Sequence, residues 1–293
     1  MKLGTQLGAI KGDSRPAVLK RARQLGCQGL EVGLAVSGIH TGTANLEELL
    51  HQARQMRTEF QQAGMEVISL TPGIILKHVQ HPAVIKAVGE VAAALGVRQI
   101  RMFFSPHVRL GGPGSQLNEW LAEFDGTKDS RYWMKRDSEY LQELLRLSQG
   151  FNLRYVFELH HGYVVNSASG AMRLLEHHPV EKVGILMDPG NMVFEGNEGW
   201  RNSVQIMGEY LAYLHCKNSR YVYRDGRWHK EWACLAEGIA DYGEIITALK
   251  DINFTGYLSV EDLRGHLSDE ERIGQGIAYL KSLVESQDRV MPV

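Results

Sequence analysis

The stretch Phe157-Glu158-Leu159-His160 closes an apolar, strand-like run and indicates the fold of the whole chain. Side chains two apart on a strand share a face, so Glu158 and His160 point one way and Leu159 the other. Three further segments also place an ionisable side chain at the end of an apolar run: Met187-Asp188-Pro189-Gly190-Asn191, Leu214-His215-Cys216-Lys217 and Val260-Glu261-Asp262. Such groups at the carboxyl ends of parallel strands are typical of the catalytic mouth of a (β/α)8 barrel.

Strand-like and helix-like segments alternate along the chain. Eight strands are expected at Leu3–Leu7, Leu30–Leu34, Glu66–Leu70, Gln99–Phe104, Arg154–Leu159, Val183–Met187, Leu211–Leu214 and Tyr257–Val260. Ser14 and Pro16 mark the start of the first helix. Later helices are expected at Asn45–Gln62, Pro82–Leu95, Tyr132–Gln149, Ser169–His177, Val204–Glu209, Tyr242–Lys250 and Asp269–Val284. Eight such units without a Gly-rich dinucleotide turn predict an α/β protein, a single-domain (β/α)8 TIM barrel over residues 1–293.

Two segments, Ser105–Ser130 and Asn218–Ala240, are long for loops between a strand and a helix. We expect both to be loops that cover the mouth of the barrel and determine substrate specificity. Trp120 lies in the first segment, and Trp228 and Trp232 lie in the second. One of these rings could stack on a flat face of a ligand, although packing within the loop is the simpler interpretation.

Composition excludes several classes of protein. A 293-residue chain that is 44% hydrophobic has ample material for one core, and a net charge of −2 argues against a broad nucleic-acid-binding face. Cys27, Cys216 and Cys234 are few and widely spaced, which favours free thiols in a reducing compartment. No apolar run has the length of a signal peptide or a membrane span. We therefore expect a soluble cytoplasmic protein that binds neither nucleic acid nor membrane.

Each ionisable residue has an ordinary structural explanation when it is taken alone. A glutamate at a strand end is often solvated, Asp188 before Pro189-Gly190 could be a turn residue, and His215 could be a hydrogen-bonded core histidine. However, strands five to eight each supply one such group at the same relative position. Two glutamates, an aspartate and a histidine suit a divalent metal such as Mn²⁺, Co²⁺, Mg²⁺ or Zn²⁺.

These segments resemble the sugar phosphate isomerase/epimerase superfamily, the xylose-isomerase-like barrels that include the ketose 3-epimerases. The resemblance spans essentially the whole chain, and its most specific stretches are residues 236–242 (AEGIADY) and 254–261 (FTGYLSVE). It implies that one divalent metal, with Mn²⁺ the first candidate, binds to four residues, namely Glu158, Asp188, His215 and Glu261. It also implies that Glu158 and Glu261 form the catalytic pair, and that the protein could be a homo-oligomer, a dimer or a tetramer.

Five further residues are candidates for binding substrate: His160, Asn191, Lys217, His107 and Arg220. His160 and Lys217 occupy positions where the family places polar residues beside the site. Asn191 is a departure, because the ketose 3-epimerases commonly have a histidine there, and an amide cannot carry a proton at neutral pH. His107 follows the fourth strand, and Arg220 lies near the position of an expected arginine but out of its register.

The function implied is a metal-dependent epimerase or isomerase of a small sugar, keto-sugar or sugar phosphate. A metal chelated by a ketone and its neighbouring hydroxyl would stabilise the enediolate formed when one glutamate removes a proton. Return of the proton by the second glutamate gives epimerisation, and return to the adjacent carbon gives isomerisation. The alternative is a lyase on the same site, which would eliminate a group from a keto-sugar or keto-glycoside, or dehydrate an inosose or a dehydroshikimate-like acid.

Two other interpretations fit less well. The endonuclease IV group shares the fold, but it needs more histidines than this chain offers, and Asp225 and His229 are four residues apart where that group has a pair two apart. A non-catalytic binding subunit would have little reason to keep all four ligands. Glu31 is expected to bond within the barrel as a structural residue, and Arg224 and Arg227 to form part of a surface cation cluster.

Overall fold

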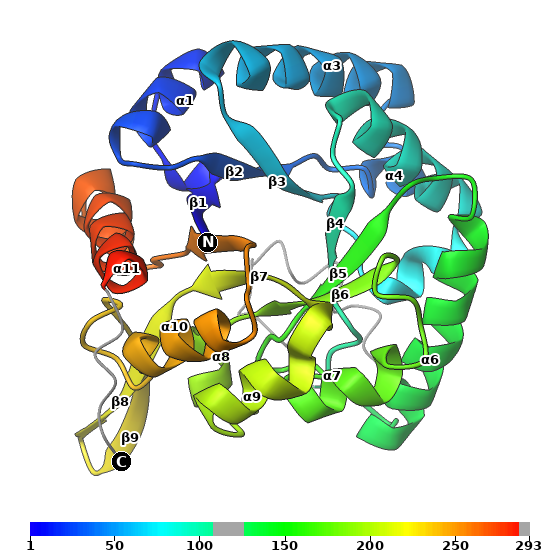
Figure 1. Ribbon diagram of the computed structural model, residues 1–293. Helices are drawn as coiled ribbons and strands as arrows, with labels where there is room; N and C mark the ends of the chain where they lie inside the picture. The colour runs from blue at the N-terminus through cyan, green and yellow to red at the C-terminus, as the bar shows by residue number, and fades with distance from the viewer. Residues whose placement is uncertain (108–125, 287–293) are drawn as a thin grey trace.

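The computed structural model describes residues 1–107 and 126–286 and shows a closed barrel of eight parallel strands inside a ring of helices (Figure 1). The strands follow the order β1-β10-β7-β6-β5-β4-β3-β2 around the barrel. Their bounds are β1 Lys2–Gln6, β2 Gly29–Gly33, β3 Glu66–Thr71, β4 Gln99–Met102, β5 Arg154–Glu158, β6 Val183–Met187, β7 Leu211–Cys216 and β10 Tyr257–Val260. The predicted (β/α)8 barrel is therefore confirmed, and each predicted strand overlaps an observed one.

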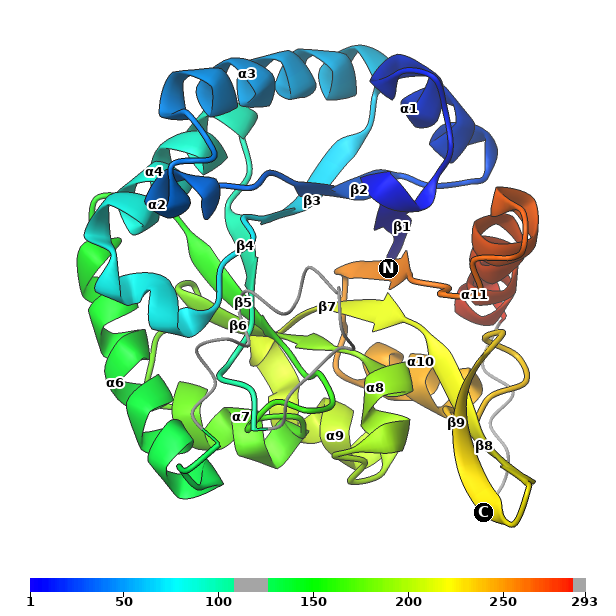
Figure 2. The same ribbon diagram turned by 180° about the vertical axis from the view of Figure 1, so that it is seen from behind.

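The helices surround the barrel on all sides, as the reverse view shows (Figure 2). The α-helices are α1 Arg15–Gln24, α2 Gly38–Thr41, α3 Leu46–Ala63, α4 Pro82–Leu95, α6 Ser130–Leu147, α7 Ala168–Leu175, α8 Pro189–Phe194, α9 Trp200–Met207, α10 Tyr242–Asp251 and α11 Gln275–Glu285. Short 3₁₀ turns lie at Leu7–Ala9, Leu76–Gln80 and Gly208–Tyr210, and a π-helical turn at Glu270–Gly274 precedes α11. Capping residues define several starts, because Ser14, Asn45 and Asp241 each accept a hydrogen bond from the first turn of the helix that follows.

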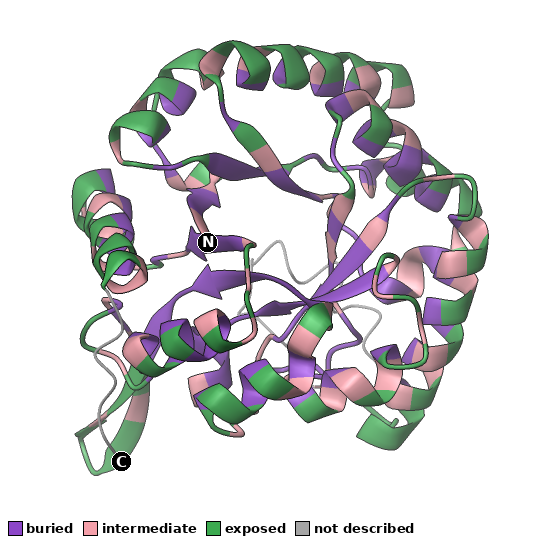
Figure 3. Ribbon diagram, in the orientation of Figure 1, coloured by how far each residue is buried: buried purple, intermediate pink, exposed green. Residues whose placement is uncertain are grey.

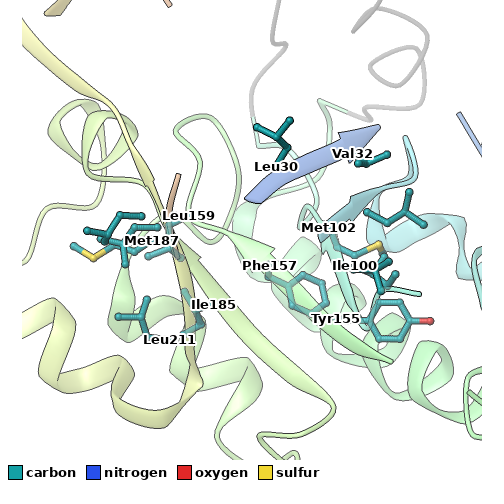
Figure 4. Close-up of a cluster of buried hydrophobic side chains, with 14 of the residues drawn as sticks. Leu30, Val32, Ile100, Met102, Tyr155, Phe157, Leu159, Ile185, Met187 and Leu211 are labelled. Carbon is teal, nitrogen blue, oxygen red and sulfur yellow. The ribbon is translucent and has the colours of Figure 1, made fainter. Parts of the chain in front are cut away.

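Apolar side chains on the outer face of the barrel form the larger core. Alternate residues of β5, Tyr155 and Phe157, point into this layer together with Leu159 beyond the strand (Figure 4). Ile185 and Met187 of β6 continue it. Figure 3 shows the strands buried almost throughout, and the helices buried only along the stripe that faces them.

A smaller apolar cluster closes the amino-terminal half of the barrel interior. It comprises Ile68, Val156, Leu186, Ala212, Tyr213 and Tyr257. Val156 alternates with Tyr155 and Phe157, so Glu158 has the inward parity predicted for it. The apolar plug leaves the carboxyl ends of the strands as the place where buried polar groups meet.

One predicted loop was wrong in part. Most of Asn218–Ala240 is an antiparallel hairpin, formed by β8 Asn218–Arg224 and β9 Arg227–Ala233. Asp225 and Gly226 make its two-residue turn with φ of 53° and 76°, the left-handed backbone that such a turn requires. The hairpin extends outward from the end of β7 (Figure 1).

Two helices also differ from the prediction. The predicted helix Val204–Glu209 corresponds to α9, which begins four residues earlier, at Trp200. Its N-cap residue is Gly199, which has no side chain to cap the helix. A second helix, α8, was not predicted: it begins at Pro189, and the Asp188 carboxylate caps it by accepting a hydrogen bond from Asn191 N.

The structure also bears on the cysteines, the first long loop and the absence of a membrane span. The three cysteines are free, as predicted. Trp120 and most of the predicted loop Ser105–Ser130 lie outside the described residues. In the described part of the chain, none of the helices combines the length and the hydrophobicity that crossing a bilayer requires.

Candidate metal centre

Four buried side chains meet at the carboxyl end of the barrel. Glu158 ends β5, Asp188 directly follows β6, His215 lies in β7 and Glu261 directly follows β10. One ligand atom from each lies within 4.8 Å of all the others. The structure therefore brings together the four residues that were predicted to bind a metal.

His215 is held from behind by a buried carboxylate. Its Nε2 lies 3.0 Å from Glu31 Oε1, and that carboxylate also accepts hydrogen bonds from Ser259 Oγ at 2.5 Å and Tyr213 OH at 3.0 Å. Glu31 thus bonds within the barrel, as expected. A carboxylate partner on one ring nitrogen makes that nitrogen the donor and leaves the other as an electron-pair donor to a ligand.

The second nitrogen of His215 faces the other three members of the cluster. Nδ1 is 3.5 Å from Glu158 Oε1, 3.7 Å from Asp188 Oδ2 and 3.3 Å from Glu261 Oε2. This atom is fully buried and has no hydrogen-bond partner. A buried polar atom without a partner needs an explanation, and here it points at the centre of three carboxylates.

A buried arginine fixes the Glu158 carboxylate. Arg101 of β4 donates to Glu158 Oε2 through Nε at 2.8 Å and through Nη2 at 2.5 Å. Burial raises the pKa of Glu158, but Arg101 and His215 together hold it well below its ordinary value. The carboxylate is therefore ionised at neutral pH, with its second oxygen facing His215.

Lys217 lies between the other two carboxylates. Its Nζ is 2.7 Å from Asp188 Oδ2 and 2.6 Å from Glu261 Oε2, and Gln6 donates to Glu261 Oε1 at 2.6 Å. Burial lowers the pKa of the ammonium, but Asp188 and Glu261 outweigh it and raise the pKa above its ordinary value. Lys217 therefore keeps its proton within the cluster.

Asn191 completes the polar network. Its Nδ2 donates to Asp188 Oδ2 at 2.7 Å and to Glu158 Oε1 at 3.4 Å, and its Oδ1 lies 2.8 Å from His161 Nδ1. His160 stacks on His161 with ring centroids 4.6 Å apart. The amide nitrogen has two N–H groups and bonds to two carboxylates. A neutral imidazole in the same place would have only one N–H to donate.

The donor set fits one divalent cation. Glu31, Glu158, Asp188 and Glu261 supply four carboxylates, and Arg101 and Lys217 supply two cations, leaving two negative charges in a buried site. Burial lowers the pKa of His215, but Glu31 and Glu261 raise it well above its ordinary value, so the ring would otherwise hold a proton. A dication bound by Glu158, Asp188, His215 and Glu261 would replace that proton and neutralise the cluster.

Two predicted substrate residues lie apart from this network. His107 Nε2 is 3.4 Å from Glu195 Oε2, and its backbone N–H donates to the carbonyl of Gly162. Arg220 is exposed near the base of the hairpin, 3.8 Å from Glu231 and on the face opposite Trp232. For both residues, a contact with substrate stays a prediction.

Sequence reasoning missed two residues that contact the cluster. Arg101 and Gln6 both lie on strands at the inward parity, and each bonds directly to a candidate ligand. The available signal was an arginine inside the apolar run Gln99–Phe104, since a charge inside a buried strand requires a partner. Gln6 had no comparable signal.

Known proteins resemble this chain in both sequence and structure. The sequence model of the xylose isomerase-like TIM barrel family matches residues 19–283. The chain belongs to this family. Among curated xylose isomerase-like relatives, an inosose dehydratase of Bacillus anthracis is 27% identical over 135 residues, which are 41% of this chain and 44% of that protein. The chain thus matches less than half the length of this relative.

Solved structures of the xylose isomerase-like family share the fold along almost the entire chain. The 3-keto-D-glucoside 4-epimerase of E. coli has a TM-score of 0.70 at 16% identity, covering 96% of this chain and 99% of its own. The D-psicose 3-epimerase of Clostridium cellulolyticum H10, solved with D-tagatose, has a TM-score of 0.68 at 16% identity, covering 98% and 100%. At this identity the likeness establishes the common barrel.

Proposed function

We propose that the protein is a divalent-metal-dependent epimerase or isomerase of a small sugar, keto-sugar or sugar phosphate. The observation that carries this proposal is the unpartnered Nδ1 of His215, buried within 3.7 Å of three carboxylates. A buried imidazole nitrogen that faces three carboxylates and has no hydrogen-bond partner is typical of a metal ligand.

Glu158, Asp188, His215 and Glu261 would hold the cation, with Mn²⁺ the first candidate. When bound, it would polarise a substrate carbonyl and make the neighbouring C–H bond more acidic. An oxygen-rich donor set with one imidazole suits Mn²⁺, Mg²⁺, Co²⁺ or Zn²⁺.

Glu158 is the proposed proton acceptor. Its pKa is held low by Arg101, so it is a carboxylate at neutral pH, and Arg101 also fixes its position. A carboxylate of low pKa is a weak base in water, and proximity to an acidified C–H bond must supply the remainder of the driving force.

Glu261 and Lys217 are the proposed source of the returning proton. Glu261 alone holds no proton at neutral pH, because His215 and Lys217 overcome the effect of burial and keep its pKa well below the ordinary value. The ammonium of Lys217, 2.6 Å away, is protonated. A proton delivered from this side would therefore come from Lys217, either directly or through the Glu261 carboxylate.

A lyase on the same residues is the second candidate, and a specific observation favours it. The curated relative described above is an inosose dehydratase, whereas two structural neighbours are epimerases. Both reactions begin with removal of a proton beside a carbonyl. They differ in whether the proton returns or a leaving group departs from the adjacent carbon.

Hydrogen exchange separates these candidates. Protein loaded with Mn²⁺ is incubated in D₂O with 3-keto-D-glucose, D-psicose and an inosose, and deuterium incorporation and product mass are measured. Incorporation without loss of water supports the epimerase or isomerase, and loss of water supports the lyase. The proposed chemistry would be contradicted by the absence of both exchange and elimination with all three compounds. Activity that persists in Glu158→Gln would also contradict it.

A further inference from the structure

One face of the β8–β9 hairpin carries four aromatic side chains at six positions. Residues directly opposite in an antiparallel pair share a face, and the pairs are Ser219 with Trp232, Tyr221 with Lys230, and Tyr223 with Trp228. These alternate pairs lie on the same side of the ribbon. We call the four rings Tyr221, Tyr223, Trp228 and Trp232 the aromatic face.

The aromatic face begins at the candidate metal centre. Lys217 Nζ, which contacts Asp188 and Glu261, lies 5.1 Å from the centre of a Trp232 ring. Trp232 packs against Phe194 of α8 with centroids 5.1 Å apart, and Phe194 in turn is 5.9 Å from Tyr221. These contacts form a path that leads from the buried cluster to Tyr221, and Tyr223 and Trp228 continue the same face of the hairpin farther out.

The outer end of the aromatic face is open to solvent. Tyr223 and Trp228 contact each other at 5.2 Å with their planes inclined at 62°, yet they are 60% and 67% exposed. They are the two most exposed large hydrophobic side chains among the described residues. Exposed tryptophan and tyrosine rings side by side are costly in water and suggest a surface that binds.

The composition of the face indicates the chemistry of its ligand. It includes rings with polar edges, one serine and one lysine, and it lacks leucine, isoleucine, valine and methionine. The opposite face is mostly charged, with Arg220 paired to Glu231 and Arg224 opposite Arg227. Flat rings with hydrogen-bonding edges suit a ligand that has both apolar C–H faces and hydroxyls, as a pyranose or an aryl group on a sugar does.

We propose that the aromatic face is a subsite for the distal part of a glycoside, so that the substrate is a keto-sugar linked to a second ring. The reacting ring would occupy the metal centre, and the linked sugar or aryl group would lie against Trp232 and Tyr221. Only a longer glycoside would reach the outer pair, which lies about 13 Å beyond Trp232 along the strands. This inference rests on the proposed function and makes it more specific. The continuity from Lys217 through Trp232 favours this ligand over a second protein, which would have no reason to reach the catalytic residues.

The test compares two probes on the Mn²⁺-loaded protein, 3-keto-D-glucose and its 4-nitrophenyl glycoside. Deuterium exchange gives kcat/KM for each. One stacked ring contributes enough to predict a preference for the glycoside of about 3- to 10-fold. Tyr221→Ala and, independently, Trp232→Leu should each bring this ratio toward one, because these two rings lie nearest the metal centre. Arg227→Ala, on the opposite face of the hairpin, should keep the wild-type ratio.

Different failures would be distinguishable. Equal kcat/KM for the two probes in the wild type, or the same loss of preference in Arg227→Ala, overturns the subsite while exchange itself still supports the proposed function. If Trp228→Ala changes the oligomeric state, measured by light scattering, the aromatic face is a contact between subunits and the proposed subsite is overturned. Absence of exchange with both probes overturns the proposed function, and the subsite as a substrate site falls with it.

Discussion

The two halves of the barrel contribute to the candidate site in different ways. Strands β5, β6, β7 and β10 supply the four converging groups, Glu158, Asp188, His215 and Glu261, from the strands or the residues that follow them. Strands β1 to β4 supply one inward polar residue each, and these contact the converging groups or one another; they are Gln6, Glu31, Ser69 and Arg101. The second half thus presents the candidate ligands and the first half orients them.

This division has a physical basis. A ligand must present an unpaired electron pair to the cation, so its own hydrogen bonds must come from behind, and in a closed barrel the facing strands are the nearest source. It also explains why sequence resemblance is stronger in the second half. The same orienting task can be done by many polar residues, whereas few residues can ligate a metal.

The largest expected effect comes from changing the second half. Glu158→Gln and Glu261→Gln should each lower kcat by about 10²- to 10⁴-fold, because an amide can neither accept the substrate proton at position 158 nor relay a proton from Lys217 at position 261. Deuterium exchange into the substrate measures the effect, and circular dichroism checks the fold. Glu237→Gln, at an exposed glutamate outside the site, is the control. Turnover within a few fold of wild type in either active-site variant would contradict the assigned roles.

A large effect on stability is expected from the first half. Arg101→Met leaves Glu158 buried without its ion pair, which should lower the free energy of unfolding of the metal-free protein by about 3–5 kcal/mol. Added Mn²⁺ should recover part of this loss, because it supplies positive charge to the same carboxylate. Chemical denaturation with and without metal gives both values.

The control for Arg101 is another arginine of the barrel. Arg154 begins β5 and bonds to backbone carbonyls of Val183, Glu209 and Tyr210 at the opposite end. Arg154→Met should destabilise the protein without any special response to Mn²⁺. Equal recovery of both variants by metal would remove the distinction between the two ends.

A smaller effect on metal binding is expected at Glu31. Glu31→Gln keeps the shape but removes the negative charge behind His215 Nε2, so Mn²⁺ affinity should fall by about 10- to 100-fold. Isothermal titration calorimetry measures the change. Glu66→Gln, where an exposed carboxylate pairs with Lys2 at 2.6 Å, should leave affinity unchanged. An unchanged affinity in Glu31→Gln would mean that β2 has no part in holding the site.

The smallest effect on the site is expected at Asp137 of α6. Burial raises the pKa of this carboxyl from 3.8 to about 7, despite hydrogen bonds from Ser105. As pH rises from 3.8 to about 7, the unfolded chain loses this proton while the folded protein retains it, so stability decreases across that window and levels off above it. Asp137→Asn should remove this decrease of stability with pH and leave metal affinity unchanged.

Denaturation from pH 4 to pH 8 tests this prediction as the difference between the two proteins. Glu143→Gln is the control on the same helix. Its pKa is lowered by a hydrogen bond from Arg146, and the residue is exposed, so its slope should stay close to that of the wild type. Parallel stability curves for the wild type and Asp137→Asn would show that Asp137 ionises normally.

The fold was largely predictable because its signals are local and repeated. Eight apolar runs alternating with helix-like segments and stopped by glycines are sufficient to predict the barrel, and inward parity places Glu158 correctly. The β8–β9 hairpin carried its own signal, Asp225-Gly226 between alternating aromatic residues, which the length of the segment obscured. The cap that turns Pro189-Gly190 into the start of a helix depends on Asp188, already interpreted as a ligand.

The candidate site was predictable in its ligands but less so in their partners. Strand ends and family resemblance indicate Glu158, Asp188, His215 and Glu261, and the structure places these side chains together. Arg101 and Gln6 approach from strands far away in the sequence, and no local pattern states that they meet a particular carboxylate. Lys217 was expected beside the substrate, and its position between two of the proposed ligands depends on side-chain packing that a sequence does not express.

The pairing of β1 with β10 closes the barrel between the first and the last strand, and it bears on when a cation could bind during synthesis. Thr5 Oγ1 donates to the carbonyl of Val260, and Gln6 donates to Glu261, each across 255 positions of the chain. A nascent polypeptide that has not yet released β10 from the ribosome lacks both the fourth carboxylate and the strand that joins the barrel's two edges. If the cluster binds a metal as proposed, tight binding would come late, after translation has passed Glu261, and would indicate that the barrel has closed.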